Sequence, residues 1–184
     1  MTLDSGKQHR ILNELYVQAC SGLLSAYGLA VHAQMQGTGT SARHNPSYVS
    51  VLGAACEGIS LSSMLKIDRN LVVNMHPLGC AEIAQADLED WCRELNNQLV
   101  GRVKNKLLGY DRTLIVGLPV LITGTDVSPL AAPNAEVHEY SFQSADGQVS
   151  LTLATLVGRD IELREVESSM DGEAVLPEGA LALF

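Results

Sequence analysis

The feature that most constrains the fold is an order of predicted elements that occurs twice along the 184 residues. Hydrophobic residues at helical spacing over 7–27 predict a long amphipathic helix, which is followed by three segments typical of strands. After a short helix predicted near 68–76, a second long helix over 87–108 is again followed by three strand-like segments. Sequence identity between the two stretches is slight, so the repeat lies in the order of elements.

Turn residues separate the strands. Glu57 and Gly58 predict a tight hairpin, Ser144–Gly147 a second one, and Pro119 interrupts a strand and implies a bend or an edge position. The six predicted strands cover residues 30–35, 47–56, 59–67, 113–124, 137–143 and 149–157. We therefore predict an α+β fold, with two related α-β-β-β halves that form an antiparallel sheet and two long helices packed on one face.

Composition excludes several classes of protein. Hydrophobic residues make up 46% of the chain and charged residues 18%, which is enough apolar surface for a sizeable core. A net charge of −9 and only 4% aromatic residues argue against binding to nucleic acid, which favours basic surfaces and stacking platforms. The N-terminus has no apolar signal region and no run of apolar residues is long enough to span a membrane, so we expect a cytoplasmic protein with no membrane partner.

The cysteines and histidines give no sign of a metal site. The four cysteines are scattered without a Cys-x-x-Cys pair, and we expect them to be small buried residues in a reducing compartment. The five histidines have no short ligand spacing. We therefore expect the chain to hold no metal of its own.

The character of the chain changes near its C-terminal end. Residues 159–184 contain seven Asp or Glu and two Arg, so this segment carries −5 of the net charge of −9. We predict a domain over 1–158 and an acidic C-terminal extension over 159–184. A plain acidic tail is the simplest interpretation, and an inhibitory or partner-binding segment is the alternative.

The second long helix has an unusual polar side. At about 100° per residue, its apolar positions fall within a stripe about 120° wide, which faces the core. Glu94 and Asn97 lie near the opposite pole, with Gly101 between them in angle and one turn further along. Asp90 and Lys104 are close by. The stripe consists of Leu88, Trp91, Cys92, Leu95, Leu99 and Val103.

Glycine in this position needs a reason, because in a helix it costs about 1 kcal/mol relative to alanine. A missing side chain at Gly101 lets another molecule come close to the helix backbone. The face therefore suits docking and polar chemistry, although Glu-x-x-Asn is common by chance and a merely solvated pair is the alternative. The neighbouring Asn96 is rotated by about 100° from Asn97, toward the boundary of the apolar stripe.

Three segments, ELNNQLVGRVKNKL, VGLPVLITG and FQSADGQVSL, together resemble the CheX-like members of the CheC/CheX/FliY chemotaxis phosphatase family. In that family a helix carrying Glu-x-x-Asn, then Gly, Lys and Leu, precedes a strand that ends in Leu-Pro and a later Gly. The resemblance covers about residues 7–157 and is strongest from 90 to 124. The matching positions are Glu94, Asn97, Gly101, Lys104, Leu107, Leu118, Pro119 and Gly124.

The resemblance implies an enzyme that hydrolyses the aspartyl-phosphate of a CheY-type response regulator. It implies two catalytic residues, Asn97 to orient the attacking water and Glu94 to pair with a lysine of the regulator, and a partner-binding face formed by Asp90, Gly101 and Lys104. No cofactor of its own is expected, since Mg²⁺ belongs to the partner. A homodimer is an expectation from the family alone.

Two departures and two rival functions remain. Arg102 places bulk and charge where small or polar residues are common in the family, and the acidic extension is additional. The first long helix has Glu14 but Val17 three residues later, so only one site is expected. One rival is a non-catalytic adaptor that binds a receiver domain or a flagellar-switch component, and the other is a sensory module with a ligand pocket.

Overall fold

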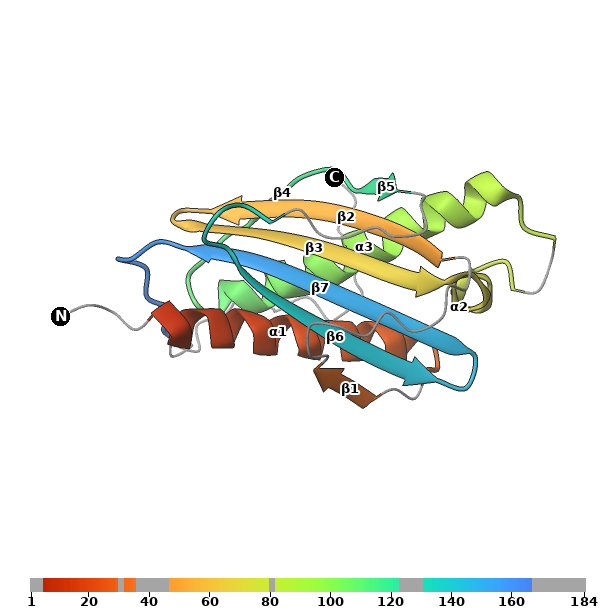
Figure 1. Cartoon of the computed structure of the whole chain (residues 1–184), viewed down its shortest axis with the longest axis horizontal. Coiled ribbons are helices and arrows are strands. Elements are labelled where there is room, and N and C mark those ends of the chain that lie inside the picture. The colour runs from red at the N-terminus through yellow and green to blue at the C-terminus, as the bar shows by residue number, and fades with distance from the viewer. Residues whose placement is uncertain (1–4, 30–31, 36–46, 80–81, 123–130, 167–184) are drawn as a thin grey trace, which may run out of the picture.

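The protein is described by a computed structural model covering residues 5–29, 32–35, 47–79, 82–122 and 131–166, and it contains the predicted elements in the predicted order (Figure 1). Both long helices begin two residues earlier than the sequence predicts and end within one residue of the predicted end. The elements are α1 (Ser5–Ala26), β1 (His32–Met35), β2 (Ser47–Cys56), β3 (Ile59–Asp68), α2 (Arg69–Met75), α3 (Gln85–Leu108), β4 (Ile115–Val116), β5 (Val120–Ile122), β6 (Glu136–Ser144) and β7 (Gly147–Val157).

The strands form one antiparallel sheet in the order β1-β6-β7-β3-β2-β4, with β5 also paired to β2. Strands β4 and β5 lie one after the other along the same edge of β2, and Pro119 is in the break between them. The edge strands are exchanged between the halves. Strand β1 of the first half pairs with β6 of the second, and β4 and β5 of the second pair with β2 of the first. Neither half can therefore complete its sheet alone.

Helices α1 and α3 lie side by side on one face of the sheet, as predicted. Helix α1 covers β6 and β7, whereas α3 covers β2 and β3, so that each helix covers strands of the opposite half (Figure 1). The core forms between this face and the two helices. The sheet thus fixes which side of each helix is buried and leaves the opposite side exposed.

Most buried positions of the two helices match at a constant offset of 80 residues. Leu12 and Leu15 on α1 correspond to Cys92 and Leu95 on α3, and all four are buried. At the same offset Tyr16 corresponds to Asn96, and both are fully buried. The helices are therefore structural repeats of each other. The further buried pairs are Gln8 and Leu88, Ala19 and Leu99, Cys20 and Val100, and Leu23 and Val103.

The cysteines that the structure describes are unpaired and mostly buried. Cys20 and Cys92 are fully buried and Cys56 is half-buried, whereas Cys80 lies outside the described residues. Burial raises the pKa of the Cys20 thiol and raises that of Cys92 to about 12. These thiols behave as small apolar side chains. Within the described ranges, no group of His, Cys, Asp and Glu is arranged to hold a metal ion, and no helix is long and apolar enough to cross a membrane.

The beginning of the acidic extension contacts the domain. Leu163 is only 2% exposed, and its backbone N–H donates to Gln8 Oε1 at 2.7 Å. The Ile161 side chain covers Gly58, where an added Cβ would lie 2.3 Å from Ile161 Cδ1, and Gly58 has a φ of +70°, so this turn requires glycine. Residues 159–166 thus pack on the domain. The domain boundary after residue 158 stays a prediction. Residues 167–184 lie outside the described part of the chain.

Candidate functional site

The predicted site residues lie along one side of α3. Asp90, Glu94, Asn97, Gly101 and Lys104 are separated alternately by four and three residues, a spacing that keeps them on one side of a helix. Asp90 and Asn97 are exposed, and the other three are partly exposed. This side faces away from the sheet because the opposite side of α3 forms part of the core. The structure therefore brings all five residues into one accessible stripe.

The adjacent asparagine has a different environment. Asn96 is fully buried, accepts a hydrogen bond from the Ser63 hydroxyl at 2.9 Å, and donates through Nδ2 to the Ser50 carbonyl at 2.9 Å. Nδ2 also lies 3.3 Å from Ser50 Oγ and from the Ser63 carbonyl. Asn96 thus connects α3 to β2 and β3 and satisfies two buried serines. Its orientation away from Asn97 agrees with the angular prediction, but it lies deeper than the boundary of the apolar stripe.

Glu94 is the centre of a small network of hydrogen bonds. Asn97 Nδ2 donates to Glu94 Oε2 at 3.4 Å, and Gln98 Nε2 donates to Glu94 Oε1 at 3.1 Å. The hydroxyl of Tyr27, just after α1, donates to Gln98 Oε1 at 2.9 Å. Each oxygen of the carboxylate therefore has one amide donor. The long bond to Asn97 is the weaker one, so the Asn97 amide can turn toward another partner at little cost.

Aromatic rings hold this network in place. Tyr27 packs edge-on against Trp91 with ring centroids 5.7 Å apart, and Trp91 packs in the same way against His76 at 5.6 Å. Gln98 and Tyr27 were not predicted from the sequence as residues of the site. The spacing of four residues between Glu94 and Gln98 is a signal that could have found Gln98. No local signal could have found Tyr27, because its proximity depends on how α1 and α3 lie together.

Gly101 faces open space. A Cβ built at this position would meet nothing within 4 Å beyond the local helix backbone, so no contact within the chain requires glycine here. Arg102 does not project freely from this edge, since its guanidinium lies 3.8 Å from the Cβ position of Gly22 on α1. Asp90 forms an ion pair with Arg93 of the same helix. We call the open space above the Gly101 backbone the clearing. It is bordered by Glu94 and Asn97 on one side and by Lys104 on the other.

The motif residues after α3 lie at the sheet edge. Leu118 is 88% exposed and falls between β4 and β5, next to Pro119. Strand β5 contacts α3, which places this apolar edge beside the helix. Ile115 and Val120 are also exposed there. Gly124 of the motif lies outside the described residues.

Comparison with known proteins finds similarity in structure. No protein-family model and no curated protein matches the sequence. The structure of the chemotaxis protein CheX from Vibrio vulnificus matches with a TM-score of 0.65 and 13% identity, covering 78% of this chain and 95% of that one. CheX in a CheX–CheY–BeF3–Mg²⁺ complex from Borrelia burgdorferi matches with a TM-score of 0.58 and 15% identity, over 78% and 96%.

A protein of another name, FliM, has a similar structure. The middle domain of FliM from H. pylori matches with a TM-score of 0.52 and 12% identity, covering 82% of this chain and 90% of that one. All three similarities extend over most of each chain. The chain therefore has the fold of the CheX and CheC-like chemotaxis proteins.

Proposed function

We propose that the chain is a phosphatase that hydrolyses the aspartyl-phosphate of a CheY-type response regulator, with α3 as its catalytic helix. The observation that carries the proposal is the exposed amide of Asn97, held beside the Glu94 carboxylate and next to the open space above Gly101. The CheX relative that forms a complex with CheY and Mg²⁺ supports a receiver-domain partner. Homodimerisation remains a prediction from the family.

Asn97 would orient the nucleophile. Its amide can accept a hydrogen bond from a water molecule and donate one to it, which fixes the water in line with the scissile P–O bond. The water oxygen attacks phosphorus, the bond between phosphorus and the aspartyl oxygen breaks, and the products are inorganic phosphate and the free carboxylate. The protons of the water leave with the phosphate. An amide is not a base, so Asn97 would contribute by positioning the water. Mg²⁺ bound by the regulator would neutralise charge on the phosphoryl group.

Glu94 would anchor the regulator. Its carboxylate is partly exposed and is kept in one orientation by two amide donors, so it offers a directed acceptor for a lysine ammonium. Pairing with lysine would replace the weak bond to Asn97 and release that amide for water. Gly101 provides room for the partner's backbone to approach α3, and Lys104 and Asp90 border this contact.

The hydrogen bonds from Tyr27 to Gln98 and from Gln98 to Glu94 should affect binding of the regulator more than the rate of hydrolysis. In Gln98→Leu, Glu94 loses its better donor, and we expect the KM for the phosphorylated regulator to rise about fivefold with a smaller change in kcat. Tyr27→Phe should have a weaker effect in the same direction. Steady-state kinetics checks both values.

The chain provides a matched control for that experiment. Tyr48 donates to Gln85 Oε1 at 3.0 Å, and Gln85 Nε2 donates to Glu89 Oε1 at 2.9 Å, which is the same arrangement elsewhere on α3. Gln85→Leu should leave KM unchanged. Equal effects of Gln85→Leu and Gln98→Leu would show that the loss is a general effect on the helix and not on Glu94.

Side chains added at Gly101 should stabilise the helix or weaken regulator binding, depending on their size. Gly101→Ala is expected to raise the free energy of unfolding by about 1 kcal/mol, because the added methyl group meets no neighbour and alanine favours helix. Gly101→Met should also fold, but it should weaken regulator binding about tenfold by filling the clearing. Denaturant unfolding and calorimetry check the two effects. Ala86→Met, on an exposed position about four turns away, is the control and should bind normally.

The similarity to FliM, which also matches in a FliG–FliM complex from H. pylori, favours one alternative, a non-catalytic adaptor that uses the same face of α3 to bind its partner. Turnover distinguishes the two functions. The protein is added at about one-twentieth of the phosphorylated regulator, a ratio at which only multiple turnovers can clear the substrate. A phosphatase releases phosphate from the whole pool faster than the regulator does alone. An adaptor affects at most the stoichiometric fraction that it binds, and this outcome would exclude the phosphatase.

A further inference from the structure

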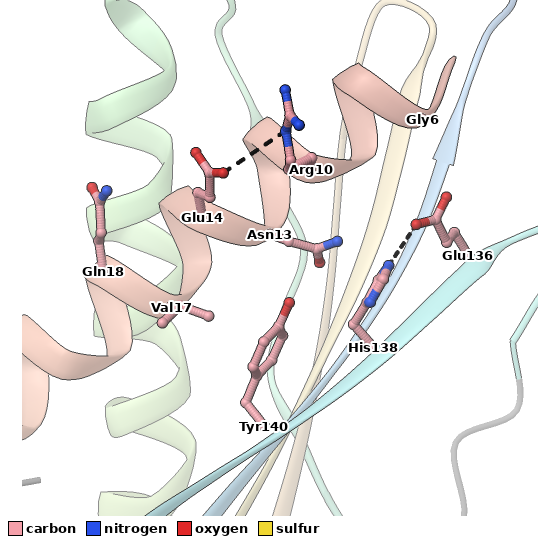
Figure 2. Close-up of a pocket in the computed structure, with 9 residues that line it drawn as sticks. All are labelled: Gly6, Arg10, Asn13, Glu14, Val17, Gln18, Glu136, His138 and Tyr140. Atoms are coloured by element: carbon pink, nitrogen blue, oxygen red, sulfur yellow. Dashed lines mark hydrogen bonds and ion pairs between the residues drawn. The ribbon is translucent and has the colours of Figure 1, made fainter. Parts of the chain in front are cut away.

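A second site lies on α1, away from the α3 stripe. A pocket of about 430 Å³ opens between α1 and β6, a volume within the range of small-molecule sites. Figure 2 shows Asn13, His138 and Tyr140 projecting into the space between helix and strand, with Arg10 and Glu14 on the outer side of the helix. The residues that line the pocket include Asn13, Glu14, Val17, Glu136, His138 and Tyr140.

The inner wall of this pocket has an unpaired acceptor. Asn13 is only 6% exposed, and its Oδ1 is buried without a hydrogen-bond partner in the described part of the chain. A buried carbonyl oxygen without a donor is unfavourable, because it has lost its hydrogen bonds to water. The Asn13 side chain points toward His138 and Tyr140, across the pocket (Figure 2). The Asn13 oxygen is thus an acceptor at the pocket wall that the described part of the chain does not satisfy.

The charges around the pocket favour a cation. Glu136 accepts from His138 Nε2 at 2.6 Å and also lies 3.7 Å from His9 Nδ1, while Glu14 lies at the exposed rim, on the outer side of α1 (Figure 2). Burial, followed by the negative charges of Glu136 and Glu14, raises the pKa of the Tyr140 hydroxyl. The one arginine, Arg10, is at the exposed rim with its Nε 3.9 Å from Glu14 Oε1, so it offsets Glu14 more than it charges the interior.

We propose that this pocket binds a small organic cation, a primary ammonium group on an aromatic or aliphatic body. An ammonium group has donors and no acceptor, which matches the Asn13 oxygen and the Glu136 carboxylate. The Tyr140 ring, stacked with the His138 ring at 6.4 Å between centroids, and the Val17 side chain line the pocket and offer apolar contact for the body of the ligand. Glu136 supplies the charge that holds the ammonium in place.

This site is independent of the proposed phosphatase. At the 80-residue offset between the helices, Glu14 and Val17 of α1 correspond to Glu94 and Asn97 of α3. The pocket is therefore lined by the two α1 residues that correspond to the proposed catalytic pair. Val17 has no amide with which to orient water. The repeat without the amide has instead a pocket against β6. Binding at this pocket can be measured without any regulator, so its failure would not affect the phosphatase proposal.

Three probes with one body and different charges test the proposal by calorimetry on the full chain: phenethylamine, 2-phenylethanol and phenylacetate. We expect phenethylamine to bind at least about tenfold more tightly than phenylacetate, with the alcohol between them, because hydrogen bonds between charged groups are stronger than those between neutral ones. Equal affinities would overturn the proposal, because they would mean that only the apolar body is bound. Absence of binding by phenethylamine would overturn it as well.

Variants assign the binding to the pocket. Asn13→Leu should weaken phenethylamine about tenfold and leave folding intact, since the Asn13 oxygen has no partner to lose. Glu136→Gln should weaken the amine more than the alcohol. Glu139→Gln removes the same charge from the same strand but faces the other side of the sheet, so it should have no effect. Unchanged affinity in Asn13→Leu, or equal losses in the two glutamate variants, would contradict the assignment.

Discussion

Asn97→Ala is expected to reduce the catalysed rate of regulator dephosphorylation by about 100-fold, because the water loses the group that holds it in line. The substitution should leave the free energy of unfolding nearly unchanged. Asn97 is exposed, its one hydrogen bond within the described chain is the long contact with Glu94, and alanine is a better helix former. Steady-state kinetics and urea denaturation measure the two properties on the same preparation.

The binding of the regulator separates this prediction from a defect in docking. Glu94 keeps its bond from Gln98 in Asn97→Ala, so the anchoring carboxylate stays in place. Calorimetry with the unphosphorylated regulator should therefore give a dissociation constant within about threefold of the wild-type value. A large loss of affinity would assign Asn97 to docking instead of water positioning.

Asn96→Ala, one residue earlier, should have the opposite consequence. We expect the free energy of unfolding to fall by about 3 kcal/mol, because the buried Ser63 hydroxyl and the polar groups of Ser50 lose their partner and a cavity is left. The change in α3 helix propensity is small and favourable, so it does not explain such a loss. Urea denaturation followed by circular dichroism measures the difference.

The two adjacent substitutions are controls for each other. Both convert asparagine to alanine on the same turn of α3, so they share any change in helix propensity. At a temperature where Asn96→Ala remains folded, its turnover should exceed that of Asn97→Ala by at least about tenfold. If Asn96→Ala were as stable as the wild type, the interpretation of Asn96 as the connection between α3 and the sheet would be wrong.

The sequence predicted the elements and their order because each one has a local signal. Periodic apolar residues indicate α1 and α3, the turn at Glu57 and Gly58 indicates the hairpin between β2 and β3, and Pro119 indicates the break between β4 and β5. The exchange of edge strands between the halves could not be predicted in this way. Strand pairing is a non-local property, and the alternation of residues along a strand does not specify its neighbour.

The same distinction between local and non-local signals applies to the residues of the site. The helix period was enough to place Glu94, Asn97 and Gly101 on one exposed side and to turn Asn96 away from them. It was not enough to show that Asn96 bonds to Ser50 and Ser63, since those serines belong to strands that lie beside α3 only after folding. The Tyr27–Gln98 bond and the pocket at Asn13 likewise depend on how separate elements meet.

The most direct test of the central claim is the rate at which a phosphorylated CheY-type regulator decays with a substoichiometric amount of protein. The measurement compares no added protein, the wild type and Asn97→Ala under identical conditions. We predict multiple-turnover acceleration by the wild type and a rate with Asn97→Ala that approaches that of the regulator alone. Equal acceleration by the two proteins would contradict the assignment of Asn97 as the residue that orients water, and no acceleration by either would contradict the phosphatase function itself.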